Sequence, residues 1–332
     1  MIKKVVLLND TSYENHHGCN IVVKNIEKNF NKRNVDIIYK NPIGIDWKKN
    51  KKFLKSLDIA DAVIVNAEGT IHSNSEYAFS LLQIVEFTNK PCFLINMTYQ
   101  NNDNKFADLV SKFKKVFVRE SFSKNELMKS NIDSIIVPDL TFYKLDNELK
   151  NHRTENYVIV TDSHDLKKSK KLYDFSKKNN FSFLPLLSPV KKFSNFKSFT
   201  RVIRYYIFIL IKKFQMRYKY KRFTLINNEN EFLSNLNSCN LLISARFHAI
   251  CLALHFSTPF IALKSNTFKI EALLNDIGLN KSRIVSMEDL NKIKSLKINV
   301  NSFSPLELEN IENYIVNANK SINKMFDEII KY

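Results

Sequence analysis

Short apolar runs alternate with amphipathic stretches along most of the chain. The runs have the length of buried strands, and the stretches between them repeat apolar residues every three or four positions, as helices do. Buried strands that alternate with helices are typical of a parallel sheet in an α/β protein. The pattern predicts strands at residues 3–9, 35–39, 61–66, 91–96, 116–118, 135–137, 157–161, 181–184, 241–243 and 259–262. It predicts helices at residues 20–30, 47–57, 76–87, 105–113, 121–128, 167–178, 230–237, 250–255, 268–275 and 305–331.

The chain divides into two halves of similar architecture. Residues 144–156 are polar and aperiodic, which makes them the best candidate for a linker. We therefore predict an N-terminal domain at residues 1–143 and a C-terminal domain at residues 157–303. Residues 304–332 then form a C-terminal helix, because Ser304-Pro305-Leu306-Glu307 is a capping box with proline at the first helical position. A chain of 332 residues is long enough for two domains with cores of their own.

The positive net charge of the chain favours partners or substrates that are negatively charged. Lys and Arg number 51 against 33 Asp and Glu, a net charge of +18, while the 44% hydrophobic content is that of a folded protein rather than a disordered one. An excess of this kind fits nucleic acid, an anionic membrane surface or phosphorylated substrates.

One segment concentrates this charge. Residues 190–223 contain no acidic side chain, and on a helical wheel most of the cations lie opposite the apolar and aromatic residues. We rank a helix lying on an anionic membrane first, a basic core helix second and a nucleic-acid patch third.

The cysteines and the N-terminus indicate a cytoplasmic protein. Cys19, Cys92, Cys239 and Cys251 are widely spaced and form no C-x-x-C pair, so we expect small buried side chains in a reducing compartment. The chain enters its first strand directly and has no apolar run of membrane-spanning length, so we expect neither a signal peptide nor a membrane span.

The strongest candidates for functional side chains lie in Ser244-Ala245-Arg246-Phe247-His248-Ala249, between the buried strands at 241–243 and 259–262. A βαβ step of this kind directs its turn to the carboxyl edge of the sheet, where open α/β folds bind ligands. Arg carries a permanent forked cation, and His can carry a proton at neutral pH. Arg246 and His248 therefore predict a site for an anionic substrate.

Two polar loops follow the first and third strands. The first, at residues 10–18, occupies the position of a phosphate-binding turn but lacks the glycines and lysine of a P-loop. Its paired histidines could bind a metal, but we favour substrate binding, because adjacent residues point apart and no third ligand lies nearby in sequence. Ordinary solvated loops remain the alternative. The candidate residues are Ser12, Glu14, His16, His17 and Gly18 in the first loop, and Glu68, Gly69 and His72 in the second.

Other strand ends carry polar residues with two open interpretations. Arg119 either reaches an anion or pairs with Glu120, and Lys269 either helps hold an anion or is a surface lysine. Asp162-Ser163-His164-Asp165 is either part of a site or a helix cap, and we favour the cap.

With these residues assembled, the chain resembles the polysaccharide pyruvyl transferase family. The resemblance rests on the Arg246-x-His248 segment, on Thr258-Pro259-Phe260-Ile261-Ala262, on Val118-Arg119-Glu120-Ser121 with Pro138-Asp139, and on Asp61-Ala62-Val63-Ile64 leading to Gly69. It implies an α/β protein with two Rossmann-like domains facing a cleft, in a GT-B-like arrangement.

The resemblance also implies a function. The expected reaction moves the pyruvyl group of phosphoenolpyruvate onto two hydroxyls of a sugar, as a ketal, in a surface glycan such as capsule or lipopolysaccharide, or in its lipid-linked precursor. No cofactor and no metal are expected, and the enzyme would work at the inner face of the membrane. The implied donor-binding residues are Arg246, Arg119, Ser244 and Lys269; His248 would transfer the proton, Glu68 or His17 would act on the acceptor hydroxyl, and Ser12, Glu14, His16, Gly18, Gly69 and His72 would line the acceptor side.

Two other functions stay open. A glycosyltransferase of the same two-domain form would use Arg246 and His248 for the phosphate of a nucleotide-activated sugar, with Glu68 or His16 as base. A basic nucleic-acid-binding protein ranks lowest, because the polar residues gather at strand ends rather than along an exposed stripe.

Overall fold

The computed structural model describes residues 1–14, 16–145, 153–186, 229–292 and 302–332. The basic segment at 190–223 and most of the predicted linker lie outside the described residues.

The N-terminal half builds a parallel six-stranded sheet in the order β2-β1-β3-β5-β7-β8. Successive residues of β1 point to opposite faces. Val5 and Leu7 pack under the first helix, α1, while Val6 and Leu8 face the helices of the other side. The strands are β1 (Lys4–Asp10), β2 (Asp36–Pro42), β3 (Ala62–Asn66), β5 (Cys92–Met97), β7 (Lys115–Val118) and β8 (Ile135–Ile136), and a separate pair joins β4 (Ile71–His72) to β6 (Tyr99–Gln100). The helices are α1 (His17–Asn31), α2 (Lys51–Ile59), α3 (Glu76–Leu82), α4 (Ile84–Phe87), α5 (Asn104–Ser111) and α6 (Ser121–Met128).

The C-terminal half repeats the architecture with a parallel five-stranded sheet, in the order β10-β9-β11-β12-β13. On β11, Leu242 faces one hydrophobic core and its neighbours Leu241 and Ile243 face the other. The strands are β9 (Val158–Val160), β10 (Ser182–Phe183), β11 (Leu241–Ser244), β12 (Phe260–Leu263) and β13 (Ile284–Val285). The helices are α7 (Leu166–Lys178), α9 (Glu229–Ser238), α10 (Phe247–His255), α11 (Lys269–Ile277) and α12 (Met287–Lys292). The protein is thus an α/β protein with two Rossmann-like domains, as predicted.

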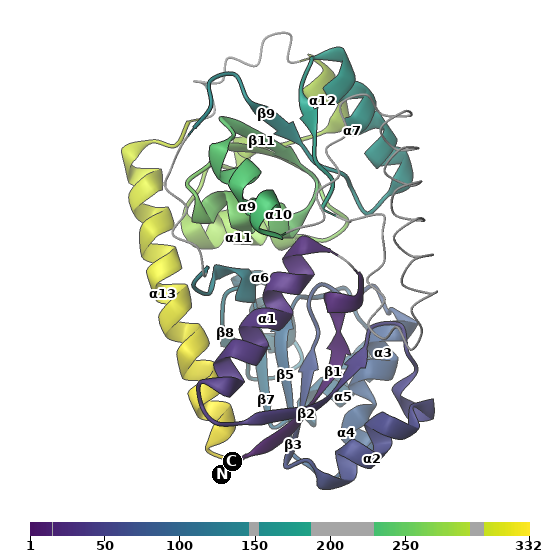
Figure 1. The fold of residues 1–332 in the computed structure, drawn as a ribbon. Helices are drawn as coiled ribbons and strands as arrows, with labels where there is room; N and C mark the ends of the chain where they lie inside the picture. Colours follow the sequence, from purple (N-terminus) through teal and green to yellow (C-terminus); the bar gives the residue numbers. More distant parts are fainter. Residues whose placement is uncertain (15, 146–152, 187–228, 293–301) are drawn as a thin grey trace, which may run out of the picture.

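A long C-terminal helix, α13 (Pro305–Ile330), runs along both domains (Figure 1). Its predicted capping box is present: Ser304 accepts from the Glu307 N–H, and the Glu307 carboxylate accepts from the Ser304 N–H. Ile311 packs in the core of the C-terminal domain, whereas Phe326 meets Phe30 of α1 in the N-terminal core. One helix therefore ties the two cores together, and it returns the C-terminus to the side of the N-terminus.

The two domains meet at the carboxyl edges of their sheets. Ser121, at the start of α6, donates its backbone N–H to Asp276 at 2.9 Å, and the Phe268 N–H donates to Gln100 Oε1 at 2.9 Å. Ile21 of α1 also belongs to the hydrophobic core of the C-terminal domain. These contacts hold the loops at the carboxyl edge of the N-terminal sheet against the loops at the carboxyl edge of the C-terminal sheet.

Two helices begin three residues earlier than the sequence predicts. His16 caps α1, because its Nδ1 accepts from the Cys19 N–H, so that His17 and Gly18 lie in the first turn of the helix. Helix α10 begins at Phe247, so that Arg246 is its N-cap residue and His248 lies in its first turn rather than in a preceding loop. None of the helices in the described part of the chain has the length and hydropathy of a membrane span.

Candidate active site between the two domains

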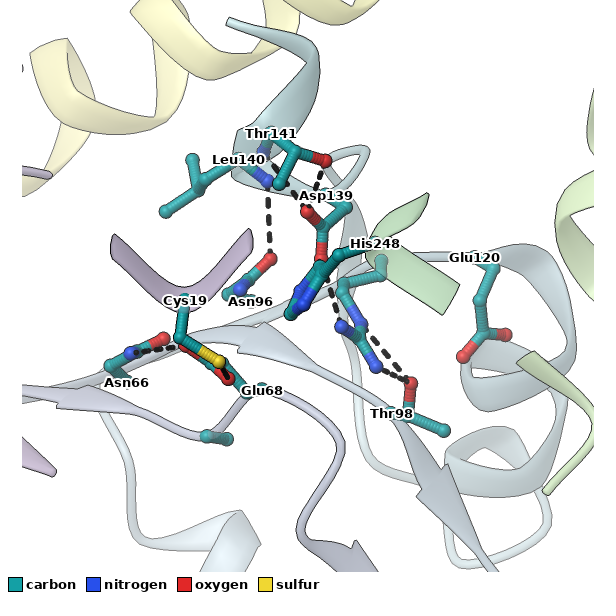
Figure 2. Close-up of polar contacts among 12 residues, drawn as sticks. Cys19, Asn66, Glu68, Asn96, Thr98, Glu120, Asp139, Leu140, Thr141 and His248 are labelled. Atoms are coloured by element: carbon teal, nitrogen blue, oxygen red, sulfur yellow. Dashed lines mark hydrogen bonds and ion pairs between the residues drawn. The ribbon is translucent and has the colours of Figure 1, made fainter. Parts of the chain in front are cut away.

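Asp139 lies at the centre of the contact between the domains. Its side chain is only 1% exposed. It accepts hydrogen bonds from the Thr141 N–H at 2.9 Å and hydroxyl at 2.7 Å, and from Arg119 Nη1 at 2.8 Å, and it lies 3.6 Å from His248 Nε2 (Figure 2). Burial alone would raise the pKa of Asp139, but the nearby His248 and Arg119 and the Thr141 hydroxyl outweigh it and hold the pKa well below its usual range. Asp139 is therefore a buried carboxylate anion.

Arg119 is fixed by its neighbours. Nε and Nη2 both donate to Thr98 Oγ1, at 3.1 and 2.6 Å, while the guanidinium carbon lies 4.6 Å from the centre of the Phe247 ring. The structure therefore does not pair Arg119 with Glu120, whose carboxylate instead caps α6 by accepting from Ser123. The positive charge of Arg119 faces the C-terminal domain in a fixed orientation.

His248 approaches the N-terminal domain very closely. A Cβ atom placed on Gly18 would lie 2.3 Å from the Cβ of His248 and 2.7 Å from its Nδ1. Only a residue without a side chain permits this approach. His248 Nε2 is buried, and its nearest charged partner in the described residues is Asp139. The imidazole thus stands beside the buried Asp139 carboxylate, which comes from the other domain.

Arg246 is held by the end of β9. Its Nε donates to Asp162 Oδ2 at 3.2 Å, its Nη2 forms an ion pair with the same carboxylate, and Nη2 also donates to the Ser163 carbonyl at 3.1 Å. The helix cap predicted in Asp162-Ser163-His164-Asp165 is confirmed: Asp165 caps α7 by accepting from the Lys168 N–H at 2.9 Å. Asp162, at the other end of this stretch, orients the arginine.

Lys269 completes a group of three cations. Its Nζ and Arg119 Nη2 lie 3.5 and 3.3 Å from the position that a Cβ on Gly69 would take, so both flank that glycine. Burial, together with the charges of Arg119 and Arg246, lowers the pKa of Lys269 to about 8. Within the described residues, Lys269 makes no ion pair. Helices α10 and α11, which begin at Phe247 and Lys269, both lack a side-chain cap at the N-terminus. Cations and free helix N–H groups together favour an anion here.

Glu68 is the acid on the N-terminal side of the site. It accepts from the Thr11 hydroxyl at 2.5 Å, from Asn66 Nδ2 at 3.2 Å and from Cys19 Sγ at 3.3 Å (Figure 2). Its backbone has φ of +45°, a conformation that non-glycine residues rarely adopt. The strained backbone and three donors fix the carboxylate near α1.

His16 lies beside His248. Its ring centre is 5.4 Å from that of His248, in an edge-to-face arrangement. Burial and the cationic neighbours, His248 first among them, lower the pKa of His16 well below its usual range. His16 is thus a neutral imidazole in the free protein.

Five other predicted residues have the following surroundings. The His17 ring stacks on Phe232 with centres 4.7 Å apart. Ser12 donates its hydroxyl to Asp10. Glu14 lies close enough to Glu68, Arg246 and His248 for their charges to act on it, and partial burial, followed by the charge of Glu68, raises its pKa. The buried Ser244 hydroxyl supports the turn by accepting from the Arg246 N–H at 3.0 Å, and His72 bonds to Ser73.

The structure brings three residues into the site that were not among the site residues predicted from the sequence: Asp139, Cys19 and Thr98. Asp139 follows the last strand of its sheet, so the rule that sites lie at carboxyl strand ends could have found it. Cys19 was predicted to be only a small buried side chain. Thr98 lies just after β5, and nothing in the sequence links it to Arg119.

A model of the polysaccharide pyruvyl transferase family matches residues 14–267. The chain belongs to that family. The matched residues run from the first polar loop to the turn before Lys269, so they include Arg119, Asp139 and the Arg246-x-His248 segment. Family membership makes the protein a transferase. No curated protein matches the sequence.

Solved structures confirm the fold. A Methanocaldococcus jannaschii UDP-GlcNAc 2-epimerase, in complex with UDP-GlcNAc and UDP, superposes with a TM-score of 0.53 at 15% identity, over 95% of this chain and 99% of the other. A Neisseria meningitidis UDP-GlcNAc 2-epimerase bound to UDP-GlcNAc gives 0.51 at 11% identity, over 95% and 98%. At such identities the likeness establishes only the shared GT-B-like arrangement of two domains.

The close approach of Gly18 to His248 predicts a stability difference between two glycine variants. In Gly18→Ala the new Cβ meets the His248 side chain near its backbone, so α1 and α10 must separate, and we expect a loss of about 1–3 kcal/mol. In Gly69→Ala the new Cβ meets only the ends of the Arg119 and Lys269 side chains, at 3.3 and 3.5 Å, so the loss should be smaller. Urea unfolding measures both, and equal stability of the two variants would contradict the predicted contact.

Proposed function

We propose that the protein transfers the pyruvyl group of phosphoenolpyruvate to two hydroxyls of a sugar in a surface glycan or its lipid-linked precursor. The products are a cyclic pyruvate ketal and inorganic phosphate. The observation that carries this proposal is Lys269, a half-buried ammonium beside two arginines and two uncapped helix N-termini, with no ion pair in the described residues. Phosphoenolpyruvate carries a carboxylate and a phosphate, and both need such donors.

The donor site is built from three cations of different kinds. Arg246 presents its guanidinium from the α10 N-terminus, and its bonds to Asp162 and Ser163 limit its motion. Lys269 faces it from the α11 N-terminus, and the fixed guanidinium of Arg119 adds charge from the other domain. Because Arg119 already donates to Asp139 and Thr98, its role is electrostatic and Lys269 makes the direct contact.

Proton transfer falls to His248 and Glu68. In the first step, the methylene carbon of the donor accepts a proton while a sugar hydroxyl adds to the neighbouring carbon. We assign the donation of this proton to His248, whose Nε2 lies 3.6 Å from the carboxylate of Asp139. Glu68 accepts the proton of the sugar hydroxyl. The second hydroxyl then displaces the phosphate at the same carbon, which closes the ketal ring and releases the second hydroxyl proton.

Ligand-induced stabilisation tests the identity of the donor. At a concentration of about 100 times Kd, phosphoenolpyruvate should stabilise the protein by about 2.7 kcal/mol and raise Tm. Lys269→Ala and Arg246→Ala should lose this shift, because each removes a cation from the anion site. Lys264→Ala, which changes an exposed lysine in the same loop, should retain it. Stabilisation by a nucleotide sugar alone would reject the pyruvyl donor and favour a glycosyltransferase.

The lowered pKa of Lys269 predicts a pH dependence of donor binding. Below about pH 8 the free protein carries the ammonium, and above it the protein must first take up a proton, so the Kd for phosphoenolpyruvate should rise by up to about tenfold per pH unit. In Lys269→Arg the cation persists, so calorimetric titrations from pH 7 to 10 should show a flatter profile. Lys264→Arg should keep the wild-type slope. Parallel profiles for wild type and Lys269→Arg would show that Lys269 does not contact the donor.

The basic segment at 190–223 is proposed, from sequence alone, to bind an anionic membrane surface beside a lipid-linked acceptor. Deleting residues 193–222 should abolish cosedimentation with vesicles that contain anionic lipid while donor binding persists. Vesicles of zwitterionic lipid serve as the control. Unchanged cosedimentation of the deletion variant would reject this role.

A further inference from the structure

His16, Cys19 and His248 form a cluster of metal-ligating side chains that the proposed reaction uses only in part. One ligand atom of each lies within 4.8 Å of the others, and all three residues are buried. They come from both domains: His16 and Cys19 from the start of α1, and His248 from the first turn of α10. We propose that this cluster binds one Zn²⁺ ion between the domains, with Glu68 as the fourth ligand.

The spacing of the cluster suits a tetrahedral ion. Zinc prefers imidazole nitrogen and thiolate sulfur, at distances that place neighbouring ligand atoms roughly 3.5 Å apart. Ligand atoms within 4.8 Å therefore need to move by well under ~1 Å each to close the site. Glu68 Oε2 lies 3.3 Å from Cys19 Sγ, close to the separation of two bound ligands, but its carboxylate is outside the 4.8 Å group, so the side chain must turn toward the two histidines to complete the site.

The sequence brings the first two ligands onto one face. His16 and Cys19 are three residues apart at a helix start, and side chains at this spacing are neighbours on a helix surface. Gly18 lies between them and permits the close approach of His248. Because Gly18 has no side chain, His248 of the other domain can come close enough to His16 and Cys19 to be the third ligand.

The charges of the ligands balance the ion. Zinc binds the thiolate, so the Cys19 proton leaves to solvent, and the thiolate with the Glu68 carboxylate offsets the two positive charges. This neutrality matters because Arg246 and Lys269 are close enough to act on the pKa of His16. His248 Nε2 lies 3.6 Å from the carboxylate of Asp139, so a metal bond at this nitrogen would replace that ion-pair contact.

Zinc binding would have two consequences. It would tie α1 to α10 and so stabilise the closed arrangement of the domains. It would also engage His248, so that, if the proposed function is correct, zinc inhibits the transfer reaction by removing its proton donor. The site itself is independent of the donor's identity.

Cobalt replaces zinc in such sites and makes the thiolate bond visible by absorption. Chelator-treated wild-type protein titrated with Co²⁺ should bind one ion per chain with a thiolate-to-cobalt charge-transfer band, and Zn²⁺ should abolish the band. Cys19→Ser should lack the band, whereas Cys92→Ser, a buried cysteine at the amino end of β5, should keep it. His248→Ala should weaken Co²⁺ binding at least tenfold.

The outcomes separate this site from the proposed function, because no donor or acceptor is present in the titration. No charge-transfer band in the folded wild-type protein would overturn the proposal, as would a band that persists in Cys19→Ser. If Cys19→Ser does not fold, Glu68→Gln provides the second variant, and it should weaken binding without removing the band. Unchanged affinity in both His248→Ala and Glu68→Gln would exclude a site between the domains.

Discussion

The arrangement of this protein depends on one buried carboxylate. Asp139 is shielded from water and ionised, and a buried charge is tolerated only where partners replace its hydration. Arg119 and Thr141 provide that replacement within the N-terminal domain, and His248 approaches from the C-terminal domain. The two Rossmann-like domains therefore meet at a fixed electrostatic point, which lies beside the apolar contacts that Ile21 and Phe142 make with the C-terminal core. Removing any one partner would leave uncompensated charge at the point where they join.

Much of the fold could be predicted from the sequence because its signals are local. The buried strand at 241–243 is apolar throughout, and the α13 capping box lies within four consecutive residues. The start of α1 could not be predicted in the same way. Histidine is not among the preferred N-cap residues, so the periodic pattern alone placed the start near Asn20, whereas His16 caps the helix through its ring nitrogen. A similar shift moved His248 from a loop into the first turn of α10.

The site was predicted only where chemistry and strand ends coincide. Arg246 and His248 follow β11 directly, so their position at the carboxyl edge could be read from the chain. The pairing of His248 with Asp139 joins residues more than a hundred positions apart, and it depends on how two domains dock. The same is true of Cys19, whose importance comes from a histidine of the other domain. The stacking of His17 on Phe232 likewise joins residues far apart in the chain, so nothing in the sequence indicates it.

Backbone conformation adds an independent reason to regard the N-terminal strand ends as functional. Asn9, Asn96 and Glu68 all have positive φ at or just after the ends of adjacent strands, where ordinary residues are extended. Asparagine tolerates this region, but for glutamate the strain is of order 1–3 kcal/mol and persists only where the surroundings fix it. Here the surroundings are the Thr11 hydroxyl, Asn66 and the Cys19 thiol, which all converge on the Glu68 carboxylate. Glycine at position 68 would relieve the strain and remove the carboxylate. Retention of a strained glutamate there is therefore best explained by the chemistry of its side chain, either as the base for an acceptor hydroxyl or as a metal ligand.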